Sequence, residues 1–152
     1  MLRFATTGDL NQLAALYKEL IKCHNIFDSE KYQIPDDEKC YAEMKNALES
    51  KNMFIICSQT DSQIDGYACF TMFSPEELDI KDGLLLLNEI FVTEAKRRLG
   101  IGTALLNEVI SVGKEKQCQM LQISVNCKNY GAQKFYEKMG ITPKTIHLEK
   151  RI

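Results

Sequence analysis

The spacing of apolar residues predicts an amphipathic helix close to the start of the chain. After a short strand at Leu2–Phe4, six apolar or aromatic residues recur every three or four positions between 10 and 21. This period places them on one face of a helix. Asp9 stands at the expected N-cap, and Gln12 follows at the position that completes a capping box. We therefore expect a helix after Asp9 that packs one side on a core.

A second helix is predicted to begin at Pro35, a residue favoured in the first turn of a helix. Acidic residues at 36–38 suit the positive end of the helix dipole, and Tyr41, Met44 and Leu48 form an apolar stripe. Residues 24–34, between the two helices, show no regular period and are expected to be irregular.

Strand-like runs dominate the middle of the chain. Residues 53–57 and 67–73 are largely apolar and are separated by turn residues at 61–65, which predicts an antiparallel hairpin. Residues 84–92 form the next strand and begin with four leucines. Such near-continuous hydrophobicity indicates an interior strand that is covered on both faces.

The last third of the chain adds two helices and two strands. A helix with apolar residues at 105–110 is expected to end near Gly113 and to lead into a strand at 119–125, which makes a right-handed βαβ unit. A helix that contains Phe135 is expected to end at Gly140 in a left-handed cap. A final strand is predicted from about Thr142 to Lys150. This order predicts a mixed α/β (α+β) sheet.

Size and charge narrow the class of protein. A chain of 152 residues suits a single domain, residues 1–152, with its own core. The net charge of −2 and pI near 5.7 provide no cationic field for a nucleic acid. No apolar run approaches the roughly 20 residues of a membrane helix, and the N-terminus has no export signal. We therefore expect a cytoplasmic protein with neither a nucleic-acid nor a membrane partner.

The cysteines and histidines do not form a metal-binding pattern. Six cysteines occur without a Cys-x-x-Cys pair and mostly within apolar segments, so they are interpreted as reduced core residues. The two histidines, His24 and His147, stand near opposite ends of the chain. A structural zinc site needs clustered ligands, and we therefore expect no metal.

A basic, glycine-containing loop at 97–102 lies between the predicted interior strand and the helix after it. The N-terminus of a helix offers unpaired N–H groups and a partial positive charge, so this setting favours binding of a phosphate or pyrophosphate. The dinucleotide fingerprint would need a third glycine where Leu105 stands, and the P-loop would need a Gly-Lys-Ser/Thr sequence that is absent. Both of these alternatives fail.

The loop, with Arg97, Gly100 and Gly102, resembles the Gln/Arg-x-x-Gly-x-Gly/Ala signature of the GCN5-related N-acetyltransferase (GNAT) superfamily. Residues 129–141 resemble the family's Asn-x-x-Ala-x-x-Phe-Tyr-x-x-x-Gly-Phe segment, with Ile141 in place of the last Phe. The order of elements also agrees over nearly the whole chain. The resemblance implies a mostly antiparallel central sheet, flanking helices and a parallel βαβ core whose strands splay apart.

The resemblance also implies a donor, acetyl-CoA, and residues that bind it. In the family, the pantetheine arm enters between the splayed strands and pairs with the strand backbone, a contact that Phe91 and Val92 would supply here. Asn129 would contact the pantetheine or its surroundings. The pyrophosphate would be held by the loop residues Arg97, Arg98, Leu99, Gly100, Ile101, Gly102 and Thr103.

Acetyl transfer to an amine needs a base, because a primary amine with a pKa near 10.4 is almost wholly protonated at pH 7. Glu89 lies just before the expected bulge, where the family often has a general base. Tyr136 stands where the family commonly has a tyrosine that protonates the leaving thiolate, and an N–H of Phe91 or Val92 would stabilise the oxyanion. From the residues alone, Glu89 could instead face solvent and Tyr136 could be a core aromatic.

A covalent acetyl-enzyme on Cys127 is not expected, because no histidine lies near it in the sequence, and a buried cysteine is the preferred interpretation. We therefore expect direct attack by the amine in a ternary complex.

The acceptor is less defined by the sequence than the donor. In the family, the acceptor cleft is bordered by segments that correspond to residues 24–38 and 74–82, and both are acidic here. Acidic borders favour a small cationic amine, although solvated loops would look the same. The alternatives are a peptide or protein N-acetyltransferase, and a regulatory acyl-CoA-binding domain without an acceptor site. Dimers are common in the family, so the resemblance also allows a homodimer.

Overall fold

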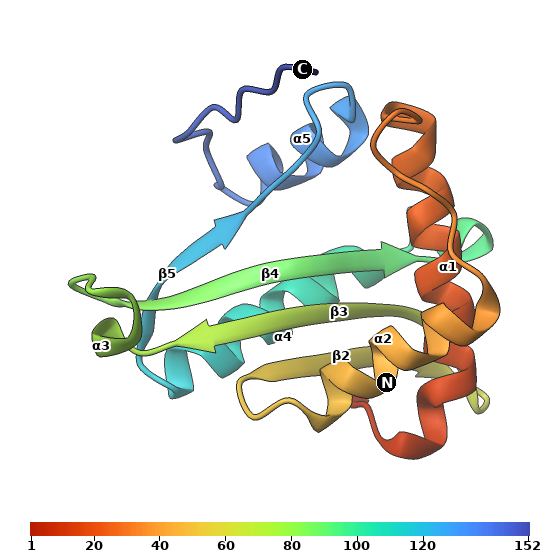
Figure 1. The fold of residues 1–152 in the computed structure, drawn as a ribbon. Coiled ribbons are helices and arrows are strands. Elements are labelled where there is room, and N and C mark those ends of the chain that lie inside the picture. The colour runs from red at the N-terminus through yellow and green to blue at the C-terminus, as the bar shows by residue number, and fades with distance from the viewer.

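The computed structural model describes residues 1–152 and contains five strands and five helices (Figure 1). The strands are β1 (Leu2–Phe4), β2 (Met53–Thr60), β3 (Gln63–Phe73), β4 (Gly83–Val92) and β5 (Cys118–Ile123). The helices are α1 (Leu10–Phe27), α2 (Asp37–Glu49), α3 (Pro75–Leu78), α4 (Ile101–Glu115) and α5 (Tyr130–Lys138), with short 3-10 turns η1 (Thr7–Asp9) and η2 (Glu94–Lys96).

The five strands form one mixed sheet in the order β1-β2-β3-β4-β5. All neighbours are antiparallel except β4 and β5, which are parallel and are joined by α4. The predicted hairpin, the interior strand and the βαβ unit are therefore confirmed. The hairpin turn is tight: Asp61 and Ser62 are its two central residues, and both have positive φ, as a type I′ turn requires.

Helices cover both faces of the sheet and create two separate cores. Helices α1 and α2 lie on one side, and α4 lies on the other (Figure 1). Side chains of β2, β3 and β4 alternate between these cores, as the pleat of a strand dictates. The core under α1 and α2 includes Leu13, Leu20, Met44, Ile55, Cys57, Tyr67 and Phe91. The core under α4 includes Ile56, Phe70, Leu85, Leu87, Leu105, Leu106 and Val109, with α5 packed against it.

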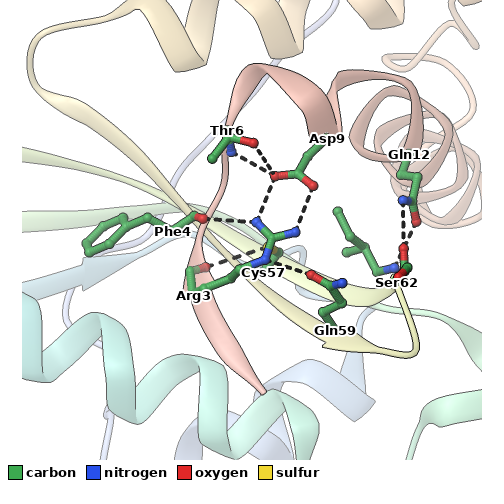
Figure 2. Close-up of polar contacts among 9 residues, drawn as sticks. Arg3, Phe4, Thr6, Asp9, Gln12, Cys57, Gln59 and Ser62 are labelled. Carbon is green, nitrogen blue, oxygen red and sulfur yellow. Dashed lines mark hydrogen bonds and ion pairs between the residues drawn. The ribbon is translucent and has the colours of Figure 1, made fainter.

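The start of α1 differs from the predicted capping box. Asp9 is at the N-cap position of α1, as predicted, but its side chain makes no capping hydrogen bond to that helix. Its carboxylate instead accepts hydrogen bonds from both Nη atoms of Arg3 at 2.8 Å and from the N–H of Thr6 at 2.7 Å (Figure 2). The capping box therefore lies three residues earlier, between Thr6 and Asp9. Gln12 instead donates to the carbonyl of Ser62 and accepts from the N–H of Ile64, which ties α1 to the β2–β3 turn.

Replacing Asp9 with Asn is expected to lower the free energy of unfolding by about 2 kcal/mol at pH 7. The hydrogen bonds from Arg3, followed by those from Thr6, lower the pKa of Asp9 from 3.8 to about 2 against the opposing effect of burial. Because the folded-state pKa is the lower one, this stabilisation is complete above about pH 5 and is lost as the pH falls towards 2. Urea unfolding at pH 7 and at pH 2.5 measures it, and an equal loss at both pH values would contradict the prediction.

Two predicted helix ends and one apolar stripe are wrong by a few residues. Helix α1 continues through His24 to Phe27, where an irregular segment was expected. Helix α4 continues through Gly113 to Glu115, because this glycine is a packing residue: a Cβ there would collide with the buried side chain of Leu85. In α2, the buried residues are Cys40, Met44 and Ala47, whereas Tyr41 is 40% exposed.

The predicted strand from Thr142 to Lys150 is absent. The chain after α5 has no regular structure, and Ile146 and Leu148 are each 87% exposed. The predicted left-handed end of α5 is confirmed, because Gly140 has φ of +75°. The pattern of the last residues is compatible with a strand, but a strand forms only where its backbone can pair with a neighbouring strand. This segment pairs with no strand.

Candidate active site

A β-bulge at Asn88 decides which way Glu89 points. In the register of β3 with β4, Cys69 pairs with Glu89 but Phe70 pairs with Leu87, so Asn88 is the extra residue. Its side-chain oxygen accepts a hydrogen bond from the hydroxyl of Thr71 at 2.8 Å. The bulge therefore comes one residue before Glu89, whereas the sequence analysis placed it after Glu89.

The extra residue moves Glu89 to the other face of the sheet. Leu87 lies in the core under α4, and strict alternation would put Glu89 there as well. After the bulge, Ile90 and Val92 pack on the α4 side, whereas Phe91 lies in the core under α1 and α2. Glu89 shares the face of Phe91, so its carboxylate lies between β4 and the two N-terminal helices.

The Glu89 carboxyl has a raised pKa. Burial raises this pKa from 4.5 to about 7, with the hydrogen bond from Tyr67 opposing the rise and the nearby charge of Glu43 contributing to it. That hydrogen bond joins the Tyr67 hydroxyl to Glu89 Oε2 at 2.8 Å. A carboxylate with a pKa near 7 takes up a proton at neutral pH far more readily than an ordinary glutamate.

Strands β4 and β5 separate next to Glu89. Their pairing runs from Gly83 with Cys118 to Leu87 with Ile123 and then stops. The remaining half of β4 therefore has no strand partner on the β5 side. This is the splayed arrangement implied by the family resemblance, and it leaves backbone groups of β4 available to a ligand.

The backbone groups of Phe91 and Val92 face different ways. Thr93 donates its N–H to the carbonyl of Asp65 in β3. Along a strand, the N–H groups of successive residues point alternately to the neighbouring strand on one side and on the other. The N–H of Phe91 therefore faces β3, whereas those of Ile90 and Val92 face the open side. Of the two residues predicted to contact pantetheine or the oxyanion, the geometry favours Val92.

The loop before α4 has the shape of an anion cradle. Gly100 has φ of +81° and forms the N-cap of α4, and Arg98 is also left-handed with φ of +67°. The first intrahelical bond joins the N–H of Ala104 to the carbonyl of Gly100. The three preceding N–H groups therefore lack helical partners; they belong to Ile101, Gly102 and Thr103.

The charges and N–H groups of the cradle suit an anion such as a pyrophosphate. Residues 97–100 are exposed, so the loop brings two arginines close in the chain to the positive end of a helix. Arg97 is the closer of the two to the strand, since its Nε donates to the carbonyl of Val92 at 3.0 Å and its guanidinium lies 5.6 Å from the Phe91 ring centre. Leu99 projects into solvent.

The predicted residues Asn129 and Tyr136 lie at the start of α5 and within it, and this helix follows β5 in the chain. Asn129 is the N-cap of α5, and its side-chain oxygen accepts from the N–H of Ala132 at 3.1 Å. Tyr136 packs against the core under α4, next to the ring of Phe135. Burial raises the pKa of Tyr136 to about 12, so its hydroxyl keeps its proton throughout the physiological range.

Cys127 and the acidic borders differ from expectation. Cys127 is exposed and not buried. In the α1–α2 connection, Glu30 pairs with Arg151 and Lys31 pairs with Glu149 of the C-terminal segment. Residues 74–82 precede Gly83, the first residue of β4, and therefore lie at the other end of this strand from Val92 (Figure 1). Only the first of the two predicted acidic borders is therefore at the end of the sheet that bears Glu89.

Three residues at the site were not given a role from the sequence. They are Tyr67, which bonds to Glu89, and the hydrogen-bonded pair Thr71 and Asn88. The available signal was the polar pair Asn88-Glu89 inside an otherwise apolar strand, because a bulge lets two adjacent polar residues avoid the same core. The structure holds no group of three or more His, Cys, Asp or Glu residues that could bind a metal ion. None of its helices is long and apolar enough to cross a membrane.

The mixed sheet with splayed parallel strands and the glycine-containing loop before α4 are the features that the family resemblance implies, and a half-buried glutamate stands beside them. The model of the acetyltransferase (GNAT) family matches residues 13–141. The chain therefore belongs to this family.

Known proteins agree with this assignment. An uncharacterized N-acetyltransferase of Methanocaldococcus jannaschii is 27% identical over 147 residues, which are 95% of this chain and 62% of that protein. The chain thus spans about three fifths of this curated relative.

Solved structures share the fold along the whole chain. A tetramutant of the BH1408 protein of Bacillus halodurans aligns with a TM-score of 0.91 and 19% identity, covering 100% of this chain and 99% of that one. AAC(6')-Iy in complex with the bisubstrate analog CoA-S-monomethyl-acetylneamine aligns with a TM-score of 0.78 and 20% identity, covering 100% and 98%. The predicted fold class is therefore confirmed.

Proposed function

We propose that residues 1–152 form a single catalytic domain that transfers an acetyl group from acetyl-CoA to a primary amine. The observation that carries this proposal is the position of Glu89, a glutamate with a pKa of about 7 beside the splayed strands. Its carboxylate takes the proton of the bound ammonium, which frees the lone pair to attack the thioester carbon directly. No covalent enzyme intermediate is required.

The donor side of the proposed reaction uses the cradle and β4. Residues 97–103 hold the pyrophosphate, with Arg97 and Arg98 as counter-charges. The N–H of Val92 faces the open side of β4 and is the donor proposed to pair with pantetheine or to stabilise the oxyanion. Asn129, which caps the start of α5, is the residue proposed to contact the pantetheine or its surroundings.

Tyr136 is the proposed general acid for the leaving group. Transfer of the acetyl group breaks the C–S bond and leaves coenzyme A as a thiolate, and the phenol then gives this sulfur its proton. The raised pKa of Tyr136 supports the role, because the hydroxyl is protonated whenever a thiolate leaves. Its hydroxyl makes no hydrogen bond within the protein and is not fully buried, which leaves it free to donate.

The proposed acceptor is a small cationic amine. Glu43 from α2 interacts electrostatically with Glu89, so two acidic groups lie in the same region and attract a cation. The same fold holds an aminoglycoside-derived bisubstrate analog in AAC(6')-Iy. This supports a cleft that accommodates coenzyme A and a polyamine-like or aminoglycoside-like acceptor together.

The proposal is tested by following the release of free thiol from acetyl-CoA with a panel of acceptors, alongside thermal-shift measurement of acetyl-CoA binding. We expect polyamines or aminoglycosides to stimulate thiol release. Stimulation only by peptide N-termini or lysine peptides would favour a peptide or protein N-acetyltransferase. Acetyl-CoA binding without release by any amine would favour the non-catalytic, regulatory alternative.

A further inference from the structure

Tyr67 is a fully buried tyrosine whose hydroxyl has one partner, the carboxylate of Glu89. The side chain is 0% exposed and lies in the core under α1 and α2. Its oxygen donates to Glu89 Oε2 at 2.8 Å. Burial, followed by the negative charge of Glu89, raises the pKa of Tyr67 well above 10, so this phenol remains a donor at any physiological pH.

The register of β3 and β4 makes this contact depend on the bulge. Tyr67 pairs with Phe91, and Cys69 pairs with Glu89, so Tyr67 and Glu89 are diagonal neighbours on one face. The strands approach closely beside them, since a Cβ on Gly66 would stand 2.6 Å from the carbonyl oxygen of Phe91. The strand next to Tyr67 therefore has no room for a side chain at position 66.

The two oxygens of Glu89 have different surroundings. Oε2 accepts from Tyr67, whereas Oε1 has no partner within the protein. Every fully buried side-chain oxygen or nitrogen in the structure has a hydrogen-bond partner, so Oε1 retains access to its surroundings. One oxygen is fixed and the other is available.

We propose that Tyr67 is a positioning residue for Glu89, whose buried phenol holds one carboxylate oxygen and leaves the other facing the acceptor amine. The proposal rests on the proposed role of Glu89 as general base. Tyr67 itself touches no reacting atom. It acts by fixing the rotamer of Glu89 and by stabilising the carboxylate over the carboxylic acid.

Other titratable groups near Glu89 do not replace this contact. Tyr17 from α1 and Glu43 from α2 interact with Glu89 through space, and Cys69 is its register partner on β3. Glu43 opposes ionisation of Glu89, and burial together with Glu89 raises the pKa of the Cys69 thiol. Tyr67 is thus the group that hydrogen-bonds to Glu89 and favours its charged form.

The test compares pH profiles of kcat/KM for the amine in the wild type and in Tyr67→Phe, which keeps the ring and removes the hydroxyl. Loss of a hydrogen bond to a charged group is expected to move the acidic midpoint upward by about one pH unit. At pH 6.5 the rate should therefore fall about tenfold, and the loss should shrink at pH 9. The KM for acetyl-CoA should not change.

Thr60→Val is the matched control, because it also removes a hydroxyl-to-carboxylate hydrogen bond, here of 2.6 Å to Asp65, at the hairpin end of β2. Its midpoint should equal that of the wild type. A wild-type midpoint in Tyr67→Phe, with or without a slower rate, would overturn the proposal and leave Tyr67 a core residue.

Two results separate this failure from failure of the proposed function. If Glu89→Gln abolishes the acidic limb while Tyr67→Phe leaves it in place, only the positioning role is wrong. If Glu89→Gln keeps the wild-type profile, the base assignment itself is wrong. Carboxyl ¹³C NMR titration, with the Glu89 signal assigned from Glu89→Gln, measures the same shift in Tyr67→Phe without turnover.

Discussion

The Glu89→Gln enzyme is expected to lose about 10²- to 10⁴-fold in kcat/KM for its amine at pH 7, the range typical of a missing general base. Glutamine has nearly the same shape and can still accept the Tyr67 hydrogen bond, so the fold and the site should be preserved. The carboxamide cannot take a proton from the ammonium. Steady-state rates of thiol release at saturating acetyl-CoA measure the loss.

The pH profile identifies the cause of this loss. Because the carboxylate is the active form, wild-type kcat/KM should rise with pH through a midpoint near 7, the pKa of Glu89. The Glu89→Gln profile should lack this limb. Tyr136→Phe is the comparison: it should slow turnover moderately, since a thiol with a pKa near 8.5 leaves without much help, and it should retain the limb.

Affinity for acetyl-CoA provides the remaining control. Glu89 makes no hydrogen bond or ion pair with the cradle at 97–103, so the thermal shift produced by acetyl-CoA should be unchanged in Glu89→Gln. Wild-type kinetics in this variant would remove Glu89 from the reaction. A lower rate with a much weaker thermal shift would instead indicate a damaged donor site.

Periodicity predicted the sheet and most of its helices because burial in this fold follows regular spacing. The leucine-rich strand at 84–92 became the interior β4, and the glycine after α5 took the left-handed conformation its position requires. Deviations from a regular period were not predictable in the same way. The bulge at Asn88 adds one residue without changing the local composition, and it reverses the direction of Glu89.

Errors at the ends of elements arose from contacts with distant segments. Asp9 is at the N-cap of α1, but its carboxylate binds Arg3 of β1 and makes no capping hydrogen bond to that helix, and Gln12 bonds to the β2–β3 turn about fifty residues away. Gly113 was predicted to end α4, but in the structure it lies within the helix, where its lack of a side chain makes room for Leu85. In each case the local sequence is compatible with two structures, and a contact with a distant part of the chain determines which one forms.

The donor half of the candidate site is local in the chain, and this is why the sequence predicts it better than the acceptor half. The cradle at 97–103 consists of consecutive residues whose N–H groups and charges are fixed by one helix start. The surroundings of Glu89 come from α1, α2 and β3, which only the fold brings together. No spacing rule in a single sequence places Tyr67 against Glu89.

The Gly100→Val enzyme is expected to show a KM for acetyl-CoA that is raised about 10- to 100-fold, the second large effect that the structure predicts. Gly100 has φ of +81°, a conformation that a β-branched residue strongly disfavours. Nothing lies within 4 Å of a Cβ added there, so the substitution causes no collision. It acts by turning the loop out of the conformation that aims the N–H groups of 101–103 at the pyrophosphate.

Gly140→Val is a closely matched control for this effect. Gly140 also has a positive φ, +75°, and also has nothing within 4 Å of an added Cβ, but it follows α5 and lies outside the cradle. Both variants should lose a similar free energy of unfolding, on the order of 1–2 kcal/mol, from the left-handed backbone. Only Gly100→Val should weaken acetyl-CoA binding, and its kcat at saturating donor should stay within a few-fold of wild type because Glu89 is untouched. Equal KM values for the two variants would show that the loop conformation at Gly100 does not hold the donor.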